Sequence, residues 1–421
     1  MSYLQDITAR FPVRKRDEEK KAFRKWAVAQ GKTLGYSARV EELARGRHCN
    51  VVFGSPEHAQ VIYTAHYDTP ARLPIPNLMT PRNIPMFALY QLGIILALLL
   101  IAVIAFVGAQ LLMRNASLSL IIALVVYYAL LLLMIAGPAN PNNVNDNTSG
   151  VAAVMETMAR MPKEQREKAA FILFDNEEKG RLGSRAFAAA NPKIKKQTLL
   201  INMDCVGVGE HILVIGKNYA RAKAEYAMLE QSFTPRDGLQ PHCYGITGSV
   251  CNSDHQAFRC GVVIVACCRK KGVGFYTTDI HTRRDTQADQ KNLDYIAESL
   301  CNFTAKGKQF NNGPYRKNTV VLFKMVLYKQ DFFVILNLPP QSSIKFLRIV
   351  LVRVITGVQI PCCSVFMSMV VGKAGTREYF YFFDRRKQDT AQLAVELIDA
   401  VDLAECRAVF IVSICVPERQ G

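Results

Sequence analysis

Two long apolar runs interrupt this sequence, and they constrain its fold more than any other feature. Residues 86–113 carry no charged side chain, and residues 118–137 are again apolar after the polar stretch 114–117. At a rise of 1.5 Å per residue the second run extends about 30 Å, the thickness of a bilayer's hydrocarbon core. Neither run has a polar face, which disfavours a pair of buried core helices. We therefore predict a transmembrane hairpin over residues 84–137.

The charges around the hairpin predict its orientation. Both ends of a hairpin emerge on one side of the bilayer, and that side holds nearly all the lysines and arginines, including Arg72 and Arg82, whereas the far turn has only Arg114. Cytoplasmic segments beside membrane helices are enriched in these residues. The twelve cysteines lack CxxC spacing and the N-terminus lacks an apolar signal segment, in agreement with a reducing compartment. We expect a multi-pass cell-membrane protein with two helices and its soluble part on the cytoplasmic side.

The overall charge is strongly basic. A formal net charge of +17 would permit nucleic-acid binding, but the basic residues are dispersed and form no nucleic-acid-binding motif. We therefore expect no nucleic-acid partner, and an anionic membrane surface is the better match for the charge. Half of the 421 residues are hydrophobic, so a large core can form without disulfides.

Outside the hairpin, short apolar runs alternate with helical segments. The runs that we predict to be strands cover residues 50–53, 60–64, 169–174, 198–203, 211–215 and 261–266. The predicted helices cover residues 13–30, 151–161, 181–190, 220–232 and 289–301, with Ser149 available to cap the second. Several strands are apolar throughout, as is typical of strands covered on both faces. The pattern predicts an α/β fold, a three-layer sandwich whose mostly parallel or mixed central sheet is flanked by helices.

We expect three parts along the chain. They are a main domain over residues 1–305, the hairpin of residues 84–137 inserted in it, and a C-terminal extension over residues 306–421. In the extension, residues 315–335 and 346–358 are strand-like or mixed, and residues 389–401 suit an amphipathic helix. The extension contains no catalytic pattern, so its role stays open.

Potential metal ligands recur along the main domain, most of them just after a predicted strand. They are His66, Asp146, Glu178, Asp204 and His281. The carboxyl ends of strands meet at one edge of an α/β sheet, which lets distant residues converge there. Two imidazoles and three carboxylates suffice for two zinc ions if one carboxylate is shared, and cobalt and manganese accept the same ligand types.

Two further acids complete a hydrolytic pattern. Glu177 precedes Glu178, so one side chain can bind metal while the other acts as a general base toward water held between the metals. Asp68 follows His66 by two residues and can accept the second ring N–H of that histidine. Taken singly, such residues are more often core histidines, helix caps or solvated surface acids. The inference rests on their occurring together, each near the end of a predicted element.

These motifs resemble those of the co-catalytic di-zinc aminopeptidase family, which includes bacterial leucyl aminopeptidases, glutamate carboxypeptidase, the glutaminyl cyclases and the transferrin-receptor ectodomain. The matching segments are residues 64–69, 145–150, 171–180, 202–204 and 281–286. The resemblance implies that Asp146 bridges two zinc ions. It further implies that His66 and Asp204 complete one ion and Glu178 and His281 the other. Glu177 would be the general base and Asp68 would orient His66.

The chain departs from the family at some points. Some members place a tyrosine directly before the last histidine, and that position is Ile280 here, with Tyr276 nearby. The hairpin between the first two ligand motifs is not general in the family. His255 lies in a stretch that the family also carries, and we interpret it as structural or substrate-lining rather than a ligand.

The leading functional hypothesis is a membrane-anchored di-zinc metallopeptidase that removes N-terminal residues from peptides. Its partners would be a peptide substrate and the bilayer, the latter through residues 84–137. Two alternatives remain. One is a related amide hydrolase or glutaminyl cyclase, and the other is a non-catalytic membrane scaffold with a peptidase-like fold. The sequence does not indicate an oligomeric state.

Overall fold

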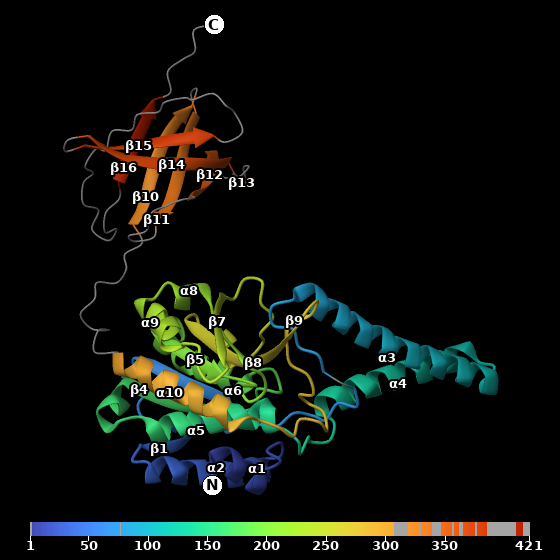
Figure 1. The fold of residues 1–421 in the computed structure, drawn as a ribbon. Coiled ribbons are helices and arrows are strands. Elements are labelled where there is room, and N and C mark those ends of the chain that lie inside the picture. The colour runs from blue at the N-terminus through green and yellow to red at the C-terminus, as the bar shows by residue number, and fades with distance from the viewer. Residues whose placement is uncertain are drawn as a thin grey trace. The chain divides into compact units, whose positions relative to one another are not determined.

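The computed structural model describes residues 2–75 and 77–306 in full, and beyond them the backbone of strands between residues 319 and 415. The chain separates into two units, residues 1–313 and 314–421. Each unit is a fold of its own and is described by itself (Figure 1).

A nine-stranded mixed sheet forms the centre of the first unit. Its strands are β1 (Ala38–Leu43), β2 (His48–Phe53), β3 (Val61–His66), β4 (Ala169–Phe174), β5 (Leu199–Met203), β6 (His211–Gly216), β7 (Gln240–Gly245), β8 (Gly261–Lys270) and β9 (Gly274–Tyr276). The order is β1-β2-β4-β3-β5-β8-β6-β7, with β9 paired to β8. The four central strands β4, β3, β5 and β8 run parallel, whereas β1, β2, β6 and β9 add antiparallel pairs. The predicted α/β fold with a mixed sheet is confirmed.

Helices cover both faces of this sheet, because alternate residues of each central strand point to opposite sides. Phe171 and Leu173 of β4 face one core, and Ala170 and Ile172 face the other. The first core is covered by α1 (Tyr3–Arg10), α2 (Asp17–Thr33), α5 (Gly150–Arg160), α8 (Asn218–Arg221), α9 (Ala224–Ser232) and α10 (Gln290–Lys306). The second is covered by α6 (Leu182–Ala190) and α7 (Pro192–Gln197).

The two apolar runs form a helical hairpin that extends away from the sheet (Figure 1). It consists of α3 (Ile84–Met113) and α4 (Ala116–Ala136). Asn83 and Asn115 cap the two helices by accepting hydrogen bonds from Met86 N and Leu118 N. Only 11% of the most apolar stretch of either helix is buried, unlike a core helix. By length and composition both helices are candidates to cross a membrane.

The segments that enter and leave the hairpin are paired with each other. Ala71 and Ala139 form an antiparallel bridge. Beside it, Arg72 N donates to Pro138 O at 2.8 Å and Asn140 N donates to Pro70 O at 3.0 Å. The inserted segment therefore leaves the domain and rejoins it at one point, and the sheet is not interrupted. Before α3 begins, the chain still follows the domain, where Met79 pairs with Thr277 and Asn83 donates to Val273 O at 2.9 Å.

Some local predictions are wrong. The helix predicted over residues 220–232 is two short helices, α8 and α9, separated at residues 222–223. Ser149 does not cap α5, because it lies in a turn of π-helix (Val144–Ser149), where its hydroxyl donates to Asn145 O at 2.7 Å. Strands β1, β7 and β9 and helices α1 and α7 were not predicted.

The second unit contains a seven-stranded sheet of order β15-β14-β12-β11-β10-β16, with β13 paired to β12. Its strands are β10 (Thr319–Leu327), β11 (Gln330–Leu338), β12 (Leu347–Ile355), β13 (Val358–Pro361), β14 (Val365–Ala374), β15 (Arg377–Asp384) and β16 (Phe410–Cys415). All neighbours are antiparallel except β10 and β16. The helix predicted over residues 389–401 lies outside the described residues.

Close packing between α6 and the end of β4 gives a test of this fold. A Cβ at Gly183 would collide with the carbonyl oxygen of Asp175 and the side chain of Asn50, whereas one at Gly93 on α3 meets nothing within 4 Å. We expect Gly183→Ala to destabilise the domain by about 1–3 kcal/mol through overpacking. Gly93→Ala is the matched control and leaves the thermal midpoint unchanged. Equal midpoints for the two variants in a thermal melt would contradict this packing.

Candidate metal centre

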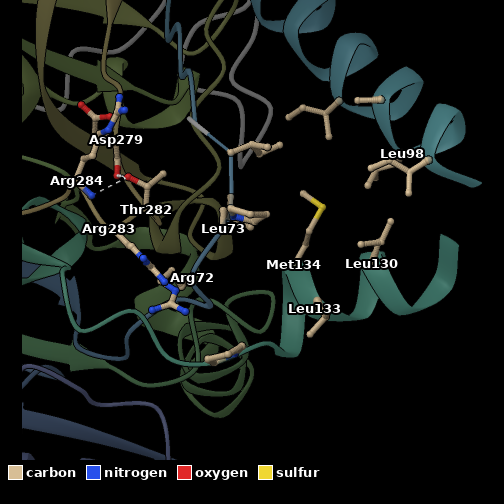
Figure 2. A pocket seen from close by; sticks show the side chains of 16 residues that line it. Arg72, Leu73, Leu98, Leu130, Leu133, Met134, Asp279, Thr282, Arg283 and Arg284 are labelled. Carbon is tan, nitrogen blue, oxygen red and sulfur yellow. Dashed lines mark hydrogen bonds between the residues drawn. The ribbon is translucent and has the colours of Figure 1, made fainter. Parts of the chain in front are cut away.

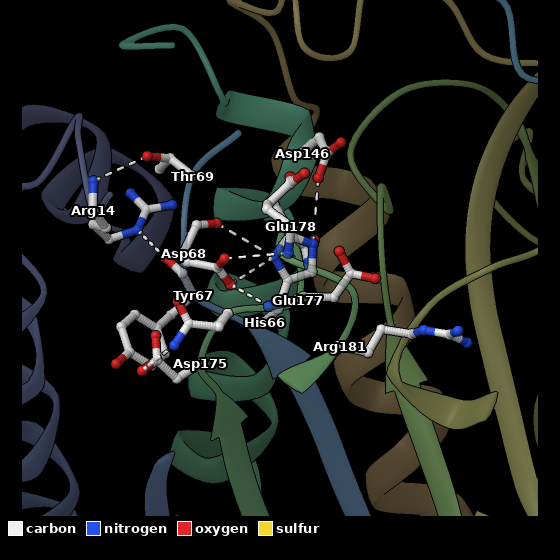
Figure 3. Close-up of polar contacts among 12 residues, drawn as sticks. Arg14, His66, Tyr67, Asp68, Thr69, Asp146, Asp175, Glu177, Glu178 and Arg181 are labelled. Carbon is white, nitrogen blue, oxygen red and sulfur yellow. Dashed lines mark hydrogen bonds and ion pairs between the residues drawn. The ribbon is translucent and has the colours of Figure 1, made fainter. Parts of the chain in front are cut away.

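The predicted ligands converge at the carboxyl ends of the central strands (Figure 3). His66 is the last residue of β3, Glu178 follows β4, and Asp204 follows β5. Asp146 lies in the kinked turn of residues 144–149 before α5, where its own backbone is not helical (φ −114°, ψ 94°), and His281 lies on the loop between β9 and α10. Five residues spread over more than two hundred positions of sequence are thus brought into one crevice by the order of the parallel strands.

The ligand atoms form overlapping groups that could each hold a metal ion. One comprises His66, Asp146 and Asp204, and another comprises Asp146, Glu178 and His281, with all candidate ligand atoms of a group within 4.8 Å of one another. The two carboxylate oxygens of Asp146 divide between the groups. Oδ1 lies 3.3 Å from His66 Nε2, and Oδ2 lies 2.9 Å from His281 Nε2. Imidazole nitrogen and carboxylate oxygen are the donors that zinc takes, so the chemistry of these residues fits zinc.

Glu177 lies on the His66 side of the crevice. With His66 and Glu178 it forms a third group of potential ligand atoms. Its backbone N–H donates to Asp68 Oδ1 at 2.9 Å, and that of Glu178 donates to Asp68 Oδ2 at 3.2 Å. Asp68 Oδ1 also lies 3.6 Å from His66 Nδ1. Asp68 therefore connects the imidazole of His66 to the turn that carries both glutamates.

Left-handed backbone occurs at or beside several of these side chains. Asn176 (φ 55°) precedes the glutamates, Cys205 (φ 55°) follows Asp204, and His281 itself has φ 62°. Residues other than glycine seldom adopt this conformation, and it is concentrated at functional sites where the surroundings enforce it. Here it turns the chain sharply after each strand, so that the side chains face the crevice.

Asp285 holds two of the loops together. Its carboxylate accepts the backbone N–H of Asn145 at 2.7 Å and that of Asp146 at 3.0 Å. Asp285 lies four residues after His281, so this pair of bonds joins the His281 loop to the turn that carries Asp146. Asp285 therefore supports both the His281 loop and the Asp146 turn.

Arg14 is a buried cation that sequence reasoning missed. Its guanidinium donates to Tyr67 O at 2.5 Å, to Asn143 Oδ1 at 3.0 Å and to Thr148 Oγ1 at 3.0 Å. It therefore joins the segment after β3 to the turn that contains Asp146. Burial lowers the pKa of Arg14 to about 10 in spite of the attraction of Asp68 and Asp146. The local sequence around Arg14 is a basic run that gives no sign of burial.

A buried ion pair supports the glutamate turn from behind. Lys20 Nζ lies 2.6 Å from Asp175 Oδ1, with both side chains about 95% buried. The same ammonium donates to Asn176 Oδ1 at 2.8 Å. Removing one partner of such a pair leaves an uncompensated charge in the interior, so the pair fixes the turn between β4 and Glu177. Sequence reasoning also missed Lys20, which lies in a charged run at the start of α2.

The crowding of acids shifts the protonation of the whole crevice. Burial raises the pKa of Glu178 to about 8, and burial with the nearby charge of Asp254 raises the pKa of Glu177 well above its usual value. Burial alone would lower the pKa of His281, but Glu178 and Asp146 raise it to about 9. The charges of these groups are therefore mutually dependent, and a divalent cation would replace the protons that they hold.

Two other predicted positions are inside the protein. Ile280, directly before His281, is buried and places no hydroxyl there. His255 is fully buried, and burial lowers its pKa to about 3, which agrees with the interpretation of a neutral, non-ligand histidine. Its neighbour Asp254 is also buried, and burial raises its pKa to about 7. Asp254 is thus a further acid near Glu177 that had no predicted role.

The Asp285 contacts predict an effect on metal affinity. Asp285→Asn keeps the shape of the side chain but replaces one acceptor oxygen with an NH₂ group, so one of the two backbone bonds to residues 145 and 146 is lost. Groups that orient metal ligands typically contribute ten- to hundredfold to affinity, and we expect a loss of about that size. The measurement is zinc competition against a chromogenic chelator. Asp289→Asn, at an exposed site on the same segment, is the control and should bind zinc as the parent does.

Comparison with known proteins relates the segment that carries most of these residues to one peptidase family. Residues 134–304 match the model of peptidase family M28, a segment that contains all of the candidate ligands except His66. A search of curated proteins found no match. Among solved structures, LapA from Legionella pneumophila is similar at 11% identity, with 72% of this chain and 71% of that chain covered and a TM-score of 0.43. BSAP, a zinc aminopeptidase from Bacillus subtilis, is similar at 16% identity, with 62% and 50% covered and a TM-score of 0.35.

The family match and the ligand motifs thus agree on one part of the chain. The segment that carries Asp146, both glutamates, Asp204 and His281 is the segment that the family model matches. Over residues 134–304 the chain is similar to peptidase family M28, and it is a zinc metallopeptidase.

Proposed function

We propose that this protein is a membrane-anchored aminopeptidase with two zinc ions, held by the five ligands His66, Asp146, Glu178, Asp204 and His281. The observation that carries the proposal is the position of Asp146, whose two oxygens face His66 and His281 in separate ligand groups. When bound, the ions supply Lewis acidity, which lowers the pKa of an attacking water and polarises the substrate carbonyl. Cobalt or manganese would suit the same donors.

Glu177 acts as the general base in this proposal. It lies with His66 and Glu178 in one group, but Glu178 is committed to His281 and Asp146. Glu177 therefore remains to take a proton from water and pass it to the leaving amine. Its place is fixed by the bond from its backbone N–H to Asp68 Oδ1, and Asp68 in turn orients His66. Asp68 is thus a positioning residue for both groups.

The surplus of acids favours a substrate with a free amino group. Half-buried Glu177 and buried Asp254 lie near Asp204. Besides burial, the charges of Asp254 and Asp204 raise the pKa of Glu177, and the charge of Asp204 raises that of Asp254. A substrate ammonium group placed among them would relieve that repulsion, which supports aminopeptidase activity over other amide hydrolysis. The scaffold alternative is not favoured, because the chain keeps all five ligands and Glu177 together.

The membrane part of the proposal rests on α3 and α4. Both helices are long, uncharged and exposed, and the segments that precede α3 and follow α4 are paired at Ala71 and Ala139. An exposed apolar surface of this extent is expected only at a membrane or a partner. The excess of Lys and Arg on the domain side favours the cytoplasmic face for the peptidase.

Replacing the proposed base tests the mechanism. Glu177→Gln removes the proton acceptor without altering the five ligands, so we expect peptide hydrolysis to fall by about 10²–10⁴-fold with the zinc content unchanged. The measurement is turnover of a panel of aminoacyl chromogenic substrates together with metal analysis of the same preparation.

Two further variants serve as controls for Glu177→Gln, one at an exposed glutamate and one at a proposed ligand. Glu164→Gln changes an exposed glutamate and should leave turnover unchanged. Glu178→Gln should lose metal as well as activity, because it removes a ligand. Parent protein without bound metal, or full activity of Glu177→Gln, would contradict the proposed function.

Metal binding should depend on pH in a defined direction. The pKa values of Glu178, about 8, and His281, about 9, mean that both groups carry protons at pH 6 in the metal-free protein. A metal must displace these protons, so affinity for zinc is expected to rise from pH 6 to pH 9. Calorimetric titration in buffers of different ionisation enthalpy counts the protons released. His58→Asn, at an exposed histidine, should release as many as the parent, and a count of zero in the parent would contradict the assignment.

A further inference from the structure

A groove lies at the base of the hairpin, beside the loop that carries His281. Its volume is about 610 Å³. One wall is apolar and comes from α3 and α4, through residues Ile94, Ala97, Leu98, Ile101, Leu130, Leu133 and Met134. The opposite side is formed by Arg72, Arg283 and Arg284 on the domain. Figure 2 shows Leu98, Leu130 and Met134 on the helices facing the loops of these arginines.

The lengths of the two helices place the bilayer boundary at this groove. α4 has 21 residues, enough to cross the hydrocarbon core, but α3 has 30. The part of α3 that runs beside α4 in the hairpin is about residues 94–113, so residues 84–93 extend beyond the core toward the domain. Since the membrane anchor is part of the proposed function, this step rests on it. The apolar wall then lies just inside the hydrocarbon and the arginines just outside.

The three arginines are available to a ligand. In the described part of the chain, none of their guanidinium groups has a hydrogen bond or an ion pair, unlike Arg82, which donates to Ser249 Oγ at 2.7 Å. Asp279 also lines the groove, and its carboxylate accepts from Thr278 at 3.2 Å. With one acid and three arginines, the domain side of the groove carries a net positive charge. Guanidinium groups match the geometry of phosphate oxygens.

We propose that this groove binds one anionic phospholipid of the surrounding bilayer. An acyl chain lies along the apolar wall of α3 and α4, and the phosphate lies among Arg72, Arg283 and Arg284. A free phosphate would leave the apolar wall uncovered, and an acidic peptide would place charged groups against it. A phospholipid covers both surfaces at the depth where each is found.

The bound lipid would rest against the metal-ligand loop. Arg283 and Arg284 follow His281 directly, and Leu73 N donates to His281 O at 2.7 Å. Asn142, at the exit of the hairpin, donates to Arg283 O at 2.6 Å. The lipid site and the loop that presents His281 therefore share one hydrogen-bonded segment.

The test uses the full chain in nanodiscs of phosphatidylcholine doped with phosphatidylglycerol. Lipids retained by the released protein are identified by native mass spectrometry. We expect about one phosphatidylglycerol per chain, with affinity about fivefold lower for each arginine changed in R72Q, R283Q and R284Q, the equivalent of about 1 kcal/mol each. Ala97→Phe fills the apolar wall with the arginines intact and should also reduce retention. Arg114→Gln, at the far turn, is the control for loss of charge alone.

The possible outcomes distinguish failure of the proposed lipid site from failure of the proposed peptidase function. Retention is measured without peptide turnover, so an inactive enzyme does not alter it. Discs that contain the chain but are not enriched in phosphatidylglycerol would overturn the lipid site alone, as would equal losses for Arg114→Gln and the groove variants. Displacement of the lipid by millimolar inorganic phosphate would assign the arginines to free phosphate and overturn the proposal. A chain that does not enter the discs would contradict the membrane anchor, and this site with it.

Discussion

The structure depends on the concentration of negative charge in a crevice that is largely closed to water. Asp68, Asp146, Glu177, Glu178 and Asp204 meet there, and a buried carboxylate is stable only when it is paired or bound to a cation. The protein provides fixed cations behind the crevice, where Arg14 and Lys20 hold the loops but not the centre. The centre of the crevice, between the imidazoles of His66 and His281, therefore has an excess of negative charge. The order of the parallel strands brings these charges together, and divalent metal ions would neutralise them.

Much of this arrangement could be predicted from sequence, because ligand residues lie where strands end. The runs at residues 169–174 and 198–203 are largely apolar and form parallel strands, so the acids that follow them lie at the same edge of the sheet. The residues whose roles were missed or wrongly predicted are those whose environment is determined by tertiary contacts. Arg14 is indistinguishable from a surface arginine until the Asp146 turn closes over it. Ser149 has the residue type and position of a cap, but its hydroxyl bonds within the turn that shapes the site. The second sheet, over residues 319–415, follows a sequence that was only partly recognised as strands.

The insertion of the hairpin is tolerated because its two ends are paired at the surface of the domain. The bridge between Ala71 and Ala139 turns a long excursion into a local connection between β3 and the Asp146 turn. The same paired segment is bonded to the loop of His281 through Leu73. Three of the ligand-bearing segments are thus joined where the hairpin begins and ends.

Under the proposed membrane topology, this placement would make assembly of the centre conditional on how the nascent chain is inserted. His66 is synthesised before both apolar helices, and the other four ligands follow them. If one helix alone crossed the bilayer, His66 and Asp146 would be left in different compartments, and the group of His66, Asp146 and Asp204 could not close. Under the proposed membrane topology, metal in the group of His66, Asp146 and Asp204 would therefore report that the membrane has been crossed an even number of times.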